Sequence, residues 1–267
     1  MFTLKECGSP LRWNLFSHWV NKAYLADYHS IITILGIDET STKKGHNYMT
    51  LGVDMDSRRV VFATPGKDVG AIEKLKSHLE EKGTKKEAIE QVSIDMSVTF
   101  ISGVGNCFPN ADITFDRFHT VKVINQAMDS VRKLERQEFA MLKGHKYTFL
   151  KHDKNLSDKQ KEGKYGLLTL YPVIANAYRL KEMFNELWTF NTIEEAGGFL
   201  SYRVDLLEES KIQPFIKAAK NIKAHWSGIV NYAKSKLTNG ILEGINSRIQ
   251  LVKREREDTE ILTTLSI

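Results

Sequence analysis

The sequence has few cysteines and no long apolar run. Only Cys7 and Cys107 occur among its 267 residues. A disulfide framework or a structural zinc site needs more ligands at paired spacing, so we expect two reduced thiols in a reducing cytoplasm. No stretch of about 18 apolar residues exists that would span a membrane. The first ten residues lack the basic and apolar segments of a signal peptide. These absences favour a cytoplasmic protein without a membrane span.

The composition is that of an ordinary globular protein, with 42% hydrophobic and 27% charged residues. The formal net charge is only +5. Positive charge is concentrated in residues 217–256, which contain nine lysines and arginines but only two acids, Glu243 and Glu255. Such a stretch neutralises phosphates in nucleic-acid-binding proteins, although a solvated helix face has the same composition.

The first half of the chain has the pattern of a mixed α/β sheet. A β-branched apolar run, 31–38, predicts a buried strand that ends at Asp38. Two further strands, 48–54 and 60–63, are joined by a polar turn and predict a hairpin. The remaining elements are predicted as helices at 68–81 and 99–107 and strands at 91–96 and 112–116. This order is typical of a mixed sheet with one antiparallel hairpin.

The second half is predicted to be helical. Apolar residues recur at helical spacing in 121–143, 167–187, 193–207, 212–233 and 241–254. The polar and charged segment 150–165 is predicted as loop. A short amphipathic helix is also expected near Trp13 to Tyr24.

Acidic residues stand where three of the predicted strands end: Asp38, Asp95 and Asp116. Sites in open α/β sheets gather at such strand ends, and carboxylate oxygens are the ligands that hard divalent cations prefer. Glu243 shares one face of the last predicted helix with Asn246, Gln250 and Lys253. Each acid also has an ordinary interpretation, as a turn former or as a helix N-terminal acid, so spacing alone leaves a metal site open.

Several segments together resemble one family of transposases. The motifs are Gly36-Ile37-Asp38-Glu39-Thr40-Ser41, Ser93-Ile94-Asp95-Met96-Ser97, Phe115-Asp116-Arg117-Phe118-His119, His225-Trp226-x-Gly228-Ile229 and Leu237-Thr238-Asn239-Gly240-x-Leu242-Glu243-Gly244. In this order they resemble the DDE transposases of the ISL-three insertion-sequence family. The resemblance runs from about residue 19 to about residue 254.

The resemblance implies a ribonuclease-H-like fold with a long all-α insertion before the final catalytic helix. It divides the chain into an N-terminal remnant (1–30), a first core part (31–120), the insertion (121–236) and the final helix with its tail (237–267). It also implies a catalytic triad of Asp38, Asp95 and Glu243 that holds two Mg²⁺ or Mn²⁺ ions. The implied reaction is cleavage and joining of double-stranded DNA at terminal inverted repeats, by a homo-oligomer in the nucleoid of a prokaryotic cytoplasm.

A second group of residues is expected to contact DNA. Asp116 and His119 resemble an Asp-x-x-His element that helps to position DNA, and a strand-end cap with a structural histidine is the alternative. Trp226 would stack on an unpaired base or, alternatively, fill the core. The basic candidates on the last helix are Arg248, Lys253 and Arg254.

Both ends of the chain depart from the family pattern. The family's zinc-binding and helix-turn-helix segment is not visible before the core. After Arg254 the run Glu257-Asp258-Thr259-Glu260-Ile261-Leu262 replaces an expected Gly-Tyr-Arg-Asn motif. Plausible codons for this run encode that motif when they are read two bases along. A truncated gene copy with a frameshifted tail is the resulting hypothesis, and sequencing the locus tests it.

Two rival functions remain from the sequence. One is a catalytically silent remnant that only binds DNA through the basic 217–256 stretch. The other is a different ribonuclease-H-like nuclease, such as a junction resolvase. The long helical insertion and the Thr238 to Gly244 motif argue against the second rival.

Overall fold

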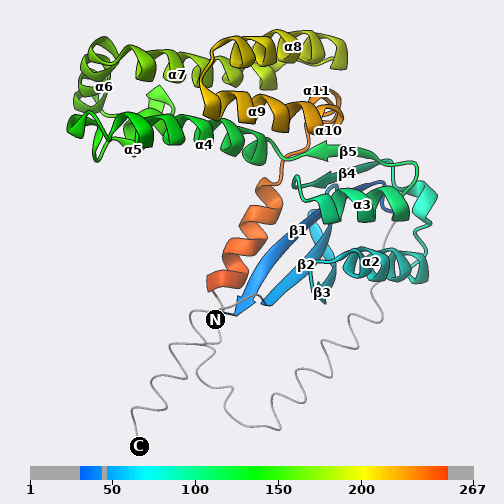
Figure 1. Ribbon diagram of the computed structural model, residues 1–267. Coiled ribbons are helices and arrows are strands. Elements are labelled where there is room, and N and C mark those ends of the chain that lie inside the picture. Colours follow the sequence, from blue (N-terminus) through cyan, green and yellow to red (C-terminus); the bar gives the residue numbers. More distant parts are fainter. Residues whose placement is uncertain (1–30, 44–46, 252–267) are drawn as a thin grey trace, which may run out of the picture.

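A mixed five-stranded sheet forms one part of the protein (Figure 1). The computed structural model describes residues 31–43 and 47–251. The strand order is β3-β2-β1-β4-β5. β1 (Ile34–Lys43), β2 (Asn47–Asp54) and β3 (Arg59–Pro65) are antiparallel neighbours, and β4 (Gln91–Ile94) and β5 (Asp112–Phe115) run parallel to β1. The predicted mixed sheet with an antiparallel hairpin is confirmed.

The prediction that the first strand ends at Asp38 is wrong, because β1 continues to Lys43. Its parallel pairing with β4 stops at Gly36 opposite Ser93, but its antiparallel pairing with β2 continues beyond Asp38. Asp38 therefore lies where β1 and β4 separate, within a strand that is still hydrogen-bonded on its other side.

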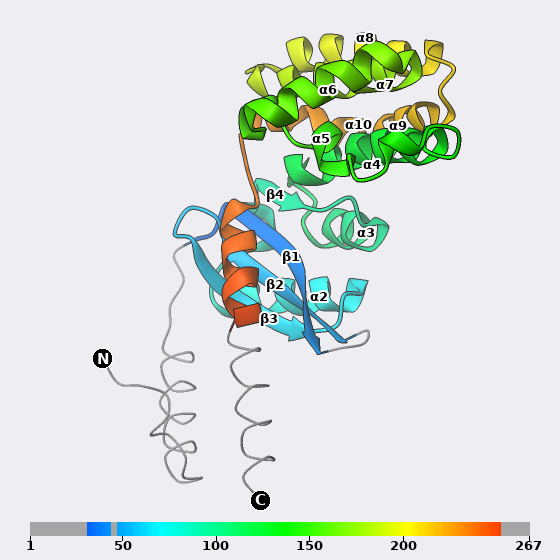
Figure 2. The same cartoon turned by 90° about the vertical axis from the view of Figure 1, so that its left-hand side faces the viewer.

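Helices cover both faces of the sheet. α2 (Val69–Glu81) and α3 (Val98–Cys107) pack Ile72, Leu75 and Phe100 into the main core on one face. The helix formed by residues 240–251 lies on the opposite face (Figure 2). Its Leu242 is fully buried against Val53 and Met55.

Gly36 allows this last helix to lie close to β1. A Cβ atom at position 36 would stand 2.5 Å from Met55 Sδ and 3.0 Å from Leu242 Cδ1. Any larger residue would therefore push the helix away from the strand that carries Asp38.

The remaining described elements, from Arg117 to Ser235, are helices stacked beside the sheet (Figure 1). They are α4 (Arg117–Glu135), α5 (Lys146–Leu150), α6 (Asp158–Leu170), α7 (Pro172–Glu182), α8 (Ile193–Glu209), α9 (Gln213–Ala224), α10 (Trp226–Val230) and α11 (Tyr232–Ser235), with 3-10 turns at Ala140–Leu142, Asp153–Asn155 and Met183–Thr189. A further 3-10 turn, Lys86–Ala88, precedes β4. The all-α insertion predicted between the fifth strand and the last helix is confirmed.

The prediction of a loop over 150–165 is wrong, because α6 begins at Asp158. Its first turn is closed by a capping box, in which Ser157 and Gln160 satisfy each other's backbone N–H groups. Its inward face carries a lysine, Lys164, which is 1% exposed and is neutralised by Asp153 and hydrogen-bonded to Tyr178. Because a lysine occupies a buried position of α6, the sequence lacks an apolar residue there and its polar composition resembles that of a loop.

Several predicted helix boundaries were also wrong. α4 begins at Arg117, four residues before the predicted start, because the chain turns into the helix directly after Asp116. Pro172 starts a new helix inside the predicted helix 167–187. The predicted helix 212–233 is broken at His225 and Asn231. The helix expected near Trp13 to Tyr24 lies outside the described residues.

α10 and α11 fasten the helical part to the sheet at β5. Asn231 Nδ2 donates to the Ile113 carbonyl at 2.8 Å, and Thr114 Oγ1 donates to Ser235 Oγ at 3.0 Å. No helix in the part of the chain that the structure describes is long and apolar enough to cross a membrane.

Candidate active site

The sheet register places three aspartates in one row. Gly36 pairs with Ser93, and Ser93 pairs with Thr114. Asp38, Asp95 and Asp116 each stand two residues beyond a member of that row. Because β1, β4 and β5 run parallel in this register, all three acids lie toward the same edge of the sheet.

Asp38 is a partly buried carboxylate held at both oxygens. Its Oδ1 accepts the Glu39 backbone N–H at 2.8 Å, and its Oδ2 accepts Asn246 Nδ2 of the last helix at 2.8 Å. Burial raises the pKa of Asp38 to about 6, and the nearby Asp95 charge adds to this rise while the two hydrogen bonds and His119 oppose it. A carboxylate in this setting gains from a nearby positive charge.

Asp95 directly follows β4 and begins the turn into α3. Its Oδ1 accepts the Ser97 backbone N–H at 2.8 Å, two residues along the chain. This local bond fixes the carboxylate at the strand end, where it interacts electrostatically with both Asp38 and His119.

Asp116 and His119 form a pair at the start of α4. Asp116 is 4% exposed, and its Oδ2 lies 3.5 Å from His119 Nδ1. The contact with Asp116 raises the pKa of His119, although burial opposes the rise. Asp116 Oδ1 also accepts the Asn239 backbone N–H at 3.5 Å. Because Asp116 is buried, only His119 of this pair, which is 29% exposed, is accessible to DNA.

The last helix is tied to β1 and β4 by amide side chains. Ser93 Oγ donates to Asn239 Oδ1 at 2.6 Å. Gln250 Nε2 donates to the Ser41 carbonyl at 2.7 Å and to Thr40 Oγ1 at 3.2 Å. Together with the Asn246 bond to Asp38, these contacts confirm that the face shared by Asn246 and Gln250 points toward the sheet.

Glu243 lies on the same helix but faces outward. It lines a hollow together with Asp116, Phe118, Val121 and Gly240. Within residues 31–43 and 47–251, no three His, Cys, Asp or Glu side chains stand close enough to hold one metal ion. The fold thus gathers Asp38, Asp95, Asp116 and His119 at one edge, with Glu243 on the rim beside Asp116.

The carboxylates Asp38 and Asp95 fit the divalent ions that the sequence implies. Oxygen donors suit Mg²⁺ and Mn²⁺, and a cation beside Asp38 would offset the burial and the Asp95 charge that raise the pKa of Asp38. Two further polar atoms near Asp38 and Ser93, Asn246 Oδ1 and Asn239 Nδ2, are buried without a hydrogen-bond partner among the described residues. The site therefore contains buried polar atoms beside its acids that can still hydrogen-bond to a further group.

The other DNA-contact candidates are placed differently. Trp226 is half-buried at the first residue of α10 and packs against the main core. Arg248 is exposed on the last helix. Lys253 and Arg254 lie outside the described residues.

Part of the basic stretch 217–256 is occupied within the protein. Lys223 Nζ lies 2.7 Å from Glu208 Oε1, and Lys234 Nζ lies 3.2 Å from Asp112 Oδ2. Lys236 donates to the Phe190 carbonyl. These three side chains are themselves exposed, so their contacts add little stability, and Lys217 and Lys220 are exposed as well.

The sequence did not reveal the positioning roles of Asn239, Asn246 and Gln250. Asn246 and Gln250 are four residues apart on the Glu243 helix, and that spacing placed them on one face. Which strand they would meet depended on the sheet order, which the sequence alone does not give.

Comparison with known proteins identifies the family. A transposase family model, that of the ISL3-type DDE transposases, matches residues 35–256. The transposase of insertion sequence element IS1001 from Bordetella parapertussis is 27% identical over 233 residues, which cover 84% of this chain and 57% of that protein. The transposase of IS1557 from Mycobacterium tuberculosis (strain H37Rv) is 26% identical over 265 residues, covering 88% of this chain and 59% of the relative.

The chain spans less than two thirds of the length of these curated relatives. The family match covers the described strands, the helical insertion and the last helix, including all three residues of the expected triad. The chain therefore belongs to the ISL3 family of DDE transposases.

Proposed function

We propose that this chain is the catalytic domain of a transposase that cuts DNA at insertion-sequence ends and joins it to a target, with two Mg²⁺ or Mn²⁺ ions. The proposal is supported by the pair Asp38 and Asp95, which each follow the last paired residues of β1 and β4 by two positions and interact electrostatically, within the matched family segment. Family membership supports DNA as the substrate, and the double-stranded ends of the element as the place of cleavage.

Each residue of the site has a distinct task in this proposal. Asp38 and Asp95 would hold the ions, and Glu243 would complete the set from the last helix. When bound, such ions would activate a water or a 3′-hydroxyl at neutral pH and stabilise the leaving oxygen. Asn246 orients the Asp38 carboxylate through its 2.8 Å bond. His119, whose pKa is raised by its contact with Asp116, would lie near the phosphate.

The proposal extends to the partners of the chain. Terminal inverted repeats would be the DNA partner, and a homo-oligomer on paired DNA ends would be the working assembly. The place of action would be the nucleoid in the prokaryotic cytoplasm.

The experiment is nicking of supercoiled plasmid DNA that carries the flanks of the coding sequence. We expect relaxed plasmid with Mg²⁺ or Mn²⁺ and none with EDTA. Glu243→Gln is expected to abolish nicking, while Glu209→Gln, at an exposed glutamate that ends α8, serves as a control. Equal nicking by Glu243→Gln and the unmutated chain would remove Glu243 from the triad.

A second candidate function is DNA binding without cleavage. The outward position of Glu243, and the absence of a ready three-acid cluster among the described residues, favour it over a different nuclease. Retarded DNA in a gel without nicked product, at every metal concentration, would support this candidate. Preferred cleavage of four-way junctions would instead support a resolvase.

A further inference from the structure

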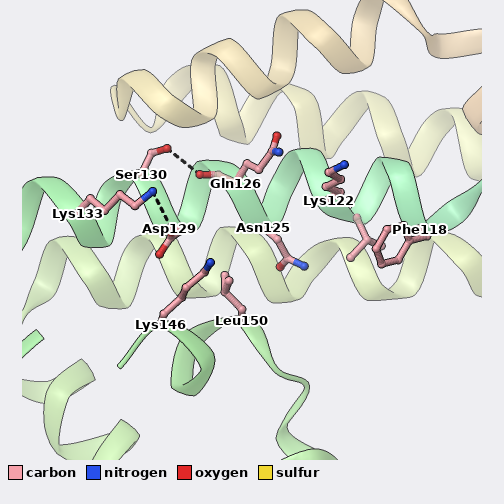
Figure 3. A pocket seen from close by; sticks show the side chains of 10 residues that line it. Phe118, Lys122, Asn125, Gln126, Asp129, Ser130, Lys133, Lys146 and Leu150 are labelled. Carbon is pink, nitrogen blue, oxygen red and sulfur yellow. Dashed lines mark hydrogen bonds and ion pairs between the residues drawn. The ribbon is translucent and has the colours of Figure 1, made fainter. Parts of the chain in front are cut away.

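A groove runs along α4 beside α5 and encloses a hollow of about 470 Å³ (Figure 3). One wall is a single face of α4, with Phe118, Lys122, Asn125 and Lys133, and the other wall is α5, with Lys146 and Leu150. The α4 residues are spaced by three, four or eight positions, as one face of a helix requires. From Phe118 to Lys133 the face is roughly 22 Å long, or about six nucleotide steps of B-form rise.

The groove begins at the candidate active site. Phe118 and Val121 line this groove and also the hollow that contains Glu243 and Gly240. α4 itself starts directly after Asp116, and the Lys122 charge acts on His119. A chain bound at the carboxylates can therefore continue into the groove without crossing another element.

The charge of the groove suits a polyanion. Lys122, Lys133 and Lys146 are exposed along it. The one acid in its lining, Asp129, is buried and is neutralised twice, by Arg132 at 2.7 Å and by Lys133 at 3.1 Å. Burial opposes ionisation of Asp129, but these two cations lower its pKa. The lining therefore keeps an excess of positive charge.

Two uncharged groups complete the groove. Phe118 is 57% exposed although it is large and apolar, and it stands between the two hollows. Exposed aromatic rings beside cations are the platforms on which unpaired bases stack. Asn125 points into the space between α4 and α5, and its Oδ1 is buried without a hydrogen-bond partner among the described residues (Figure 3).

We propose that the α4–α5 groove binds the DNA strand that leaves the catalytic carboxylates. Phe118 stacks on a base next to the cleaved position, Lys122 and Lys146 contact successive phosphates, and Asn125 accepts a hydrogen bond from a base or from bound water. This assignment rests on the proposed function, because it takes the acids at the sheet edge as the place where DNA is cut.

The test measures DNA affinity without cleavage. A fluorescently labelled duplex with a single-stranded extension is titrated with protein in EDTA, by anisotropy, at several salt concentrations. The double variant Lys122→Gln/Lys146→Gln is expected to reduce the slope of log Kd against log salt by about two, because each lost phosphate contact removes about 0.9. The control, Lys74→Gln/Lys85→Gln, removes one exposed lysine of α2 and one just after it, on the sheet face opposite the last helix. It is expected to leave the slope unchanged.

A fluorescent adenine analogue in the extension reports on Phe118. Stacking quenches the analogue, and we expect Phe118→Ala to restore its emission and weaken binding roughly five- to hundredfold. Phe118→Trp is expected to keep both the quenching and the affinity. Circular dichroism of every variant checks that α4 and its neighbours remain folded.

The outcomes separate the groove from the catalytic proposal. Normal affinity and slope in the double variant, or unchanged quenching in Phe118→Ala, would overturn the groove assignment even if the chain nicks DNA. Absence of any DNA binding by the unmutated chain would overturn it as well. If the groove variants lose DNA binding but the unmutated chain does not nick DNA, the groove is supported as a DNA-binding site and the catalytic proposal is contradicted.

Discussion

Asp38 depends on a residue that approaches from the other end of the sequence. Asn246, on the last helix, donates to Asp38 Oδ2 across 208 residues of chain. Residues that orient a metal ligand commonly change metal affinity or activity when they are replaced. In the proposed site Asn246 would fix the Asp38 carboxylate, and its effect is expected to act through the metal.

Replacement of Asn246 by alanine tests this role. We expect nicking to fall roughly 10- to 100-fold and the Mn²⁺ concentration for half-maximal nicking to rise. Ser247→Ala, at the exposed next position of the same helix, is the matched control and should behave like the unmutated chain. A normal metal dependence in Asn246→Ala would show that Asp38 does not need this bond.

A second single residue, Gly228, controls how α10 meets the sheet. A Cβ at this position would lie 2.5 Å from two carbon atoms of the buried Phe115 ring. Gly228→Ala is expected to lower the free energy of unfolding by about 1–3 kcal/mol, because the ring and helix must move apart. Gly105→Ala in α3 meets no atom within 4 Å and is expected to be neutral or stabilising by up to about 1 kcal/mol. Urea titration compares the two, and equal stabilities would contradict the close approach.

Among the elements, those with regular apolar periodicity were predicted well. The hairpin of β2 and β3 and the helix α2 follow directly from alternation and from an amphipathic stripe. α6 was missed because Lys164 occupies a position where the pattern requires an apolar side chain. β1 was predicted too short, since its continuation past Asp38 depends on pairing with β2, which is a tertiary contact.

α6 is expected to depend on its buried cation. Lys164→Met keeps most of the side-chain volume but removes the cation that contacts Asp153 and Tyr178, which stay hydrogen-bonded to each other at 2.9 Å. We expect a loss of about 1 kcal/mol in unfolding free energy, at the low end for a charged hydrogen bond because Asp153 is 41% exposed. Lys161→Met removes an exposed ion pair of the same helix and should cost less. Equal losses would mean that burial of Lys164 contributes nothing.

The same pair predicts a pH dependence. The Lys164 hydrogen bond lowers the pKa of Asp153 below its ordinary value of 3.8. A carboxylate with a depressed pKa stabilises the fold fully above its unfolded pKa of about 3.9 and loses that contribution as the pH falls through its folded pKa. The stability difference between the unmutated chain and Lys164→Met should therefore be constant near neutral pH and shrink below about pH 4. A difference that grows on acidification would contradict this sign.

At the scale of the whole molecule, the sheet register makes the site. The sequence predicted Asp38, Asp95 and Asp116 at strand ends, which is correct for Asp95 and Asp116 but not for Asp38, and the parallel pairing of β1, β4 and β5 brings their positions into one row. Glu243 was named through the family resemblance, because helical spacing alone does not say where the last helix docks. The groove beside α4 was not predictable, since it requires α5 to lie against α4 and the last helix to lie near Phe118.

The most direct test of the central claim uses the two aspartates that the register aligns. Metal-dependent nicking is measured for Asp38→Asn, Asp95→Asn and the control Asp112→Asn, an exposed aspartate at the opposite end of β5. We predict that the first two variants bind DNA but produce no nicked plasmid with Mg²⁺ or Mn²⁺, while Asp112→Asn nicks normally. Undiminished nicking by folded Asp38→Asn or Asp95→Asn would contradict the assignment of the catalytic metals to this edge of the sheet.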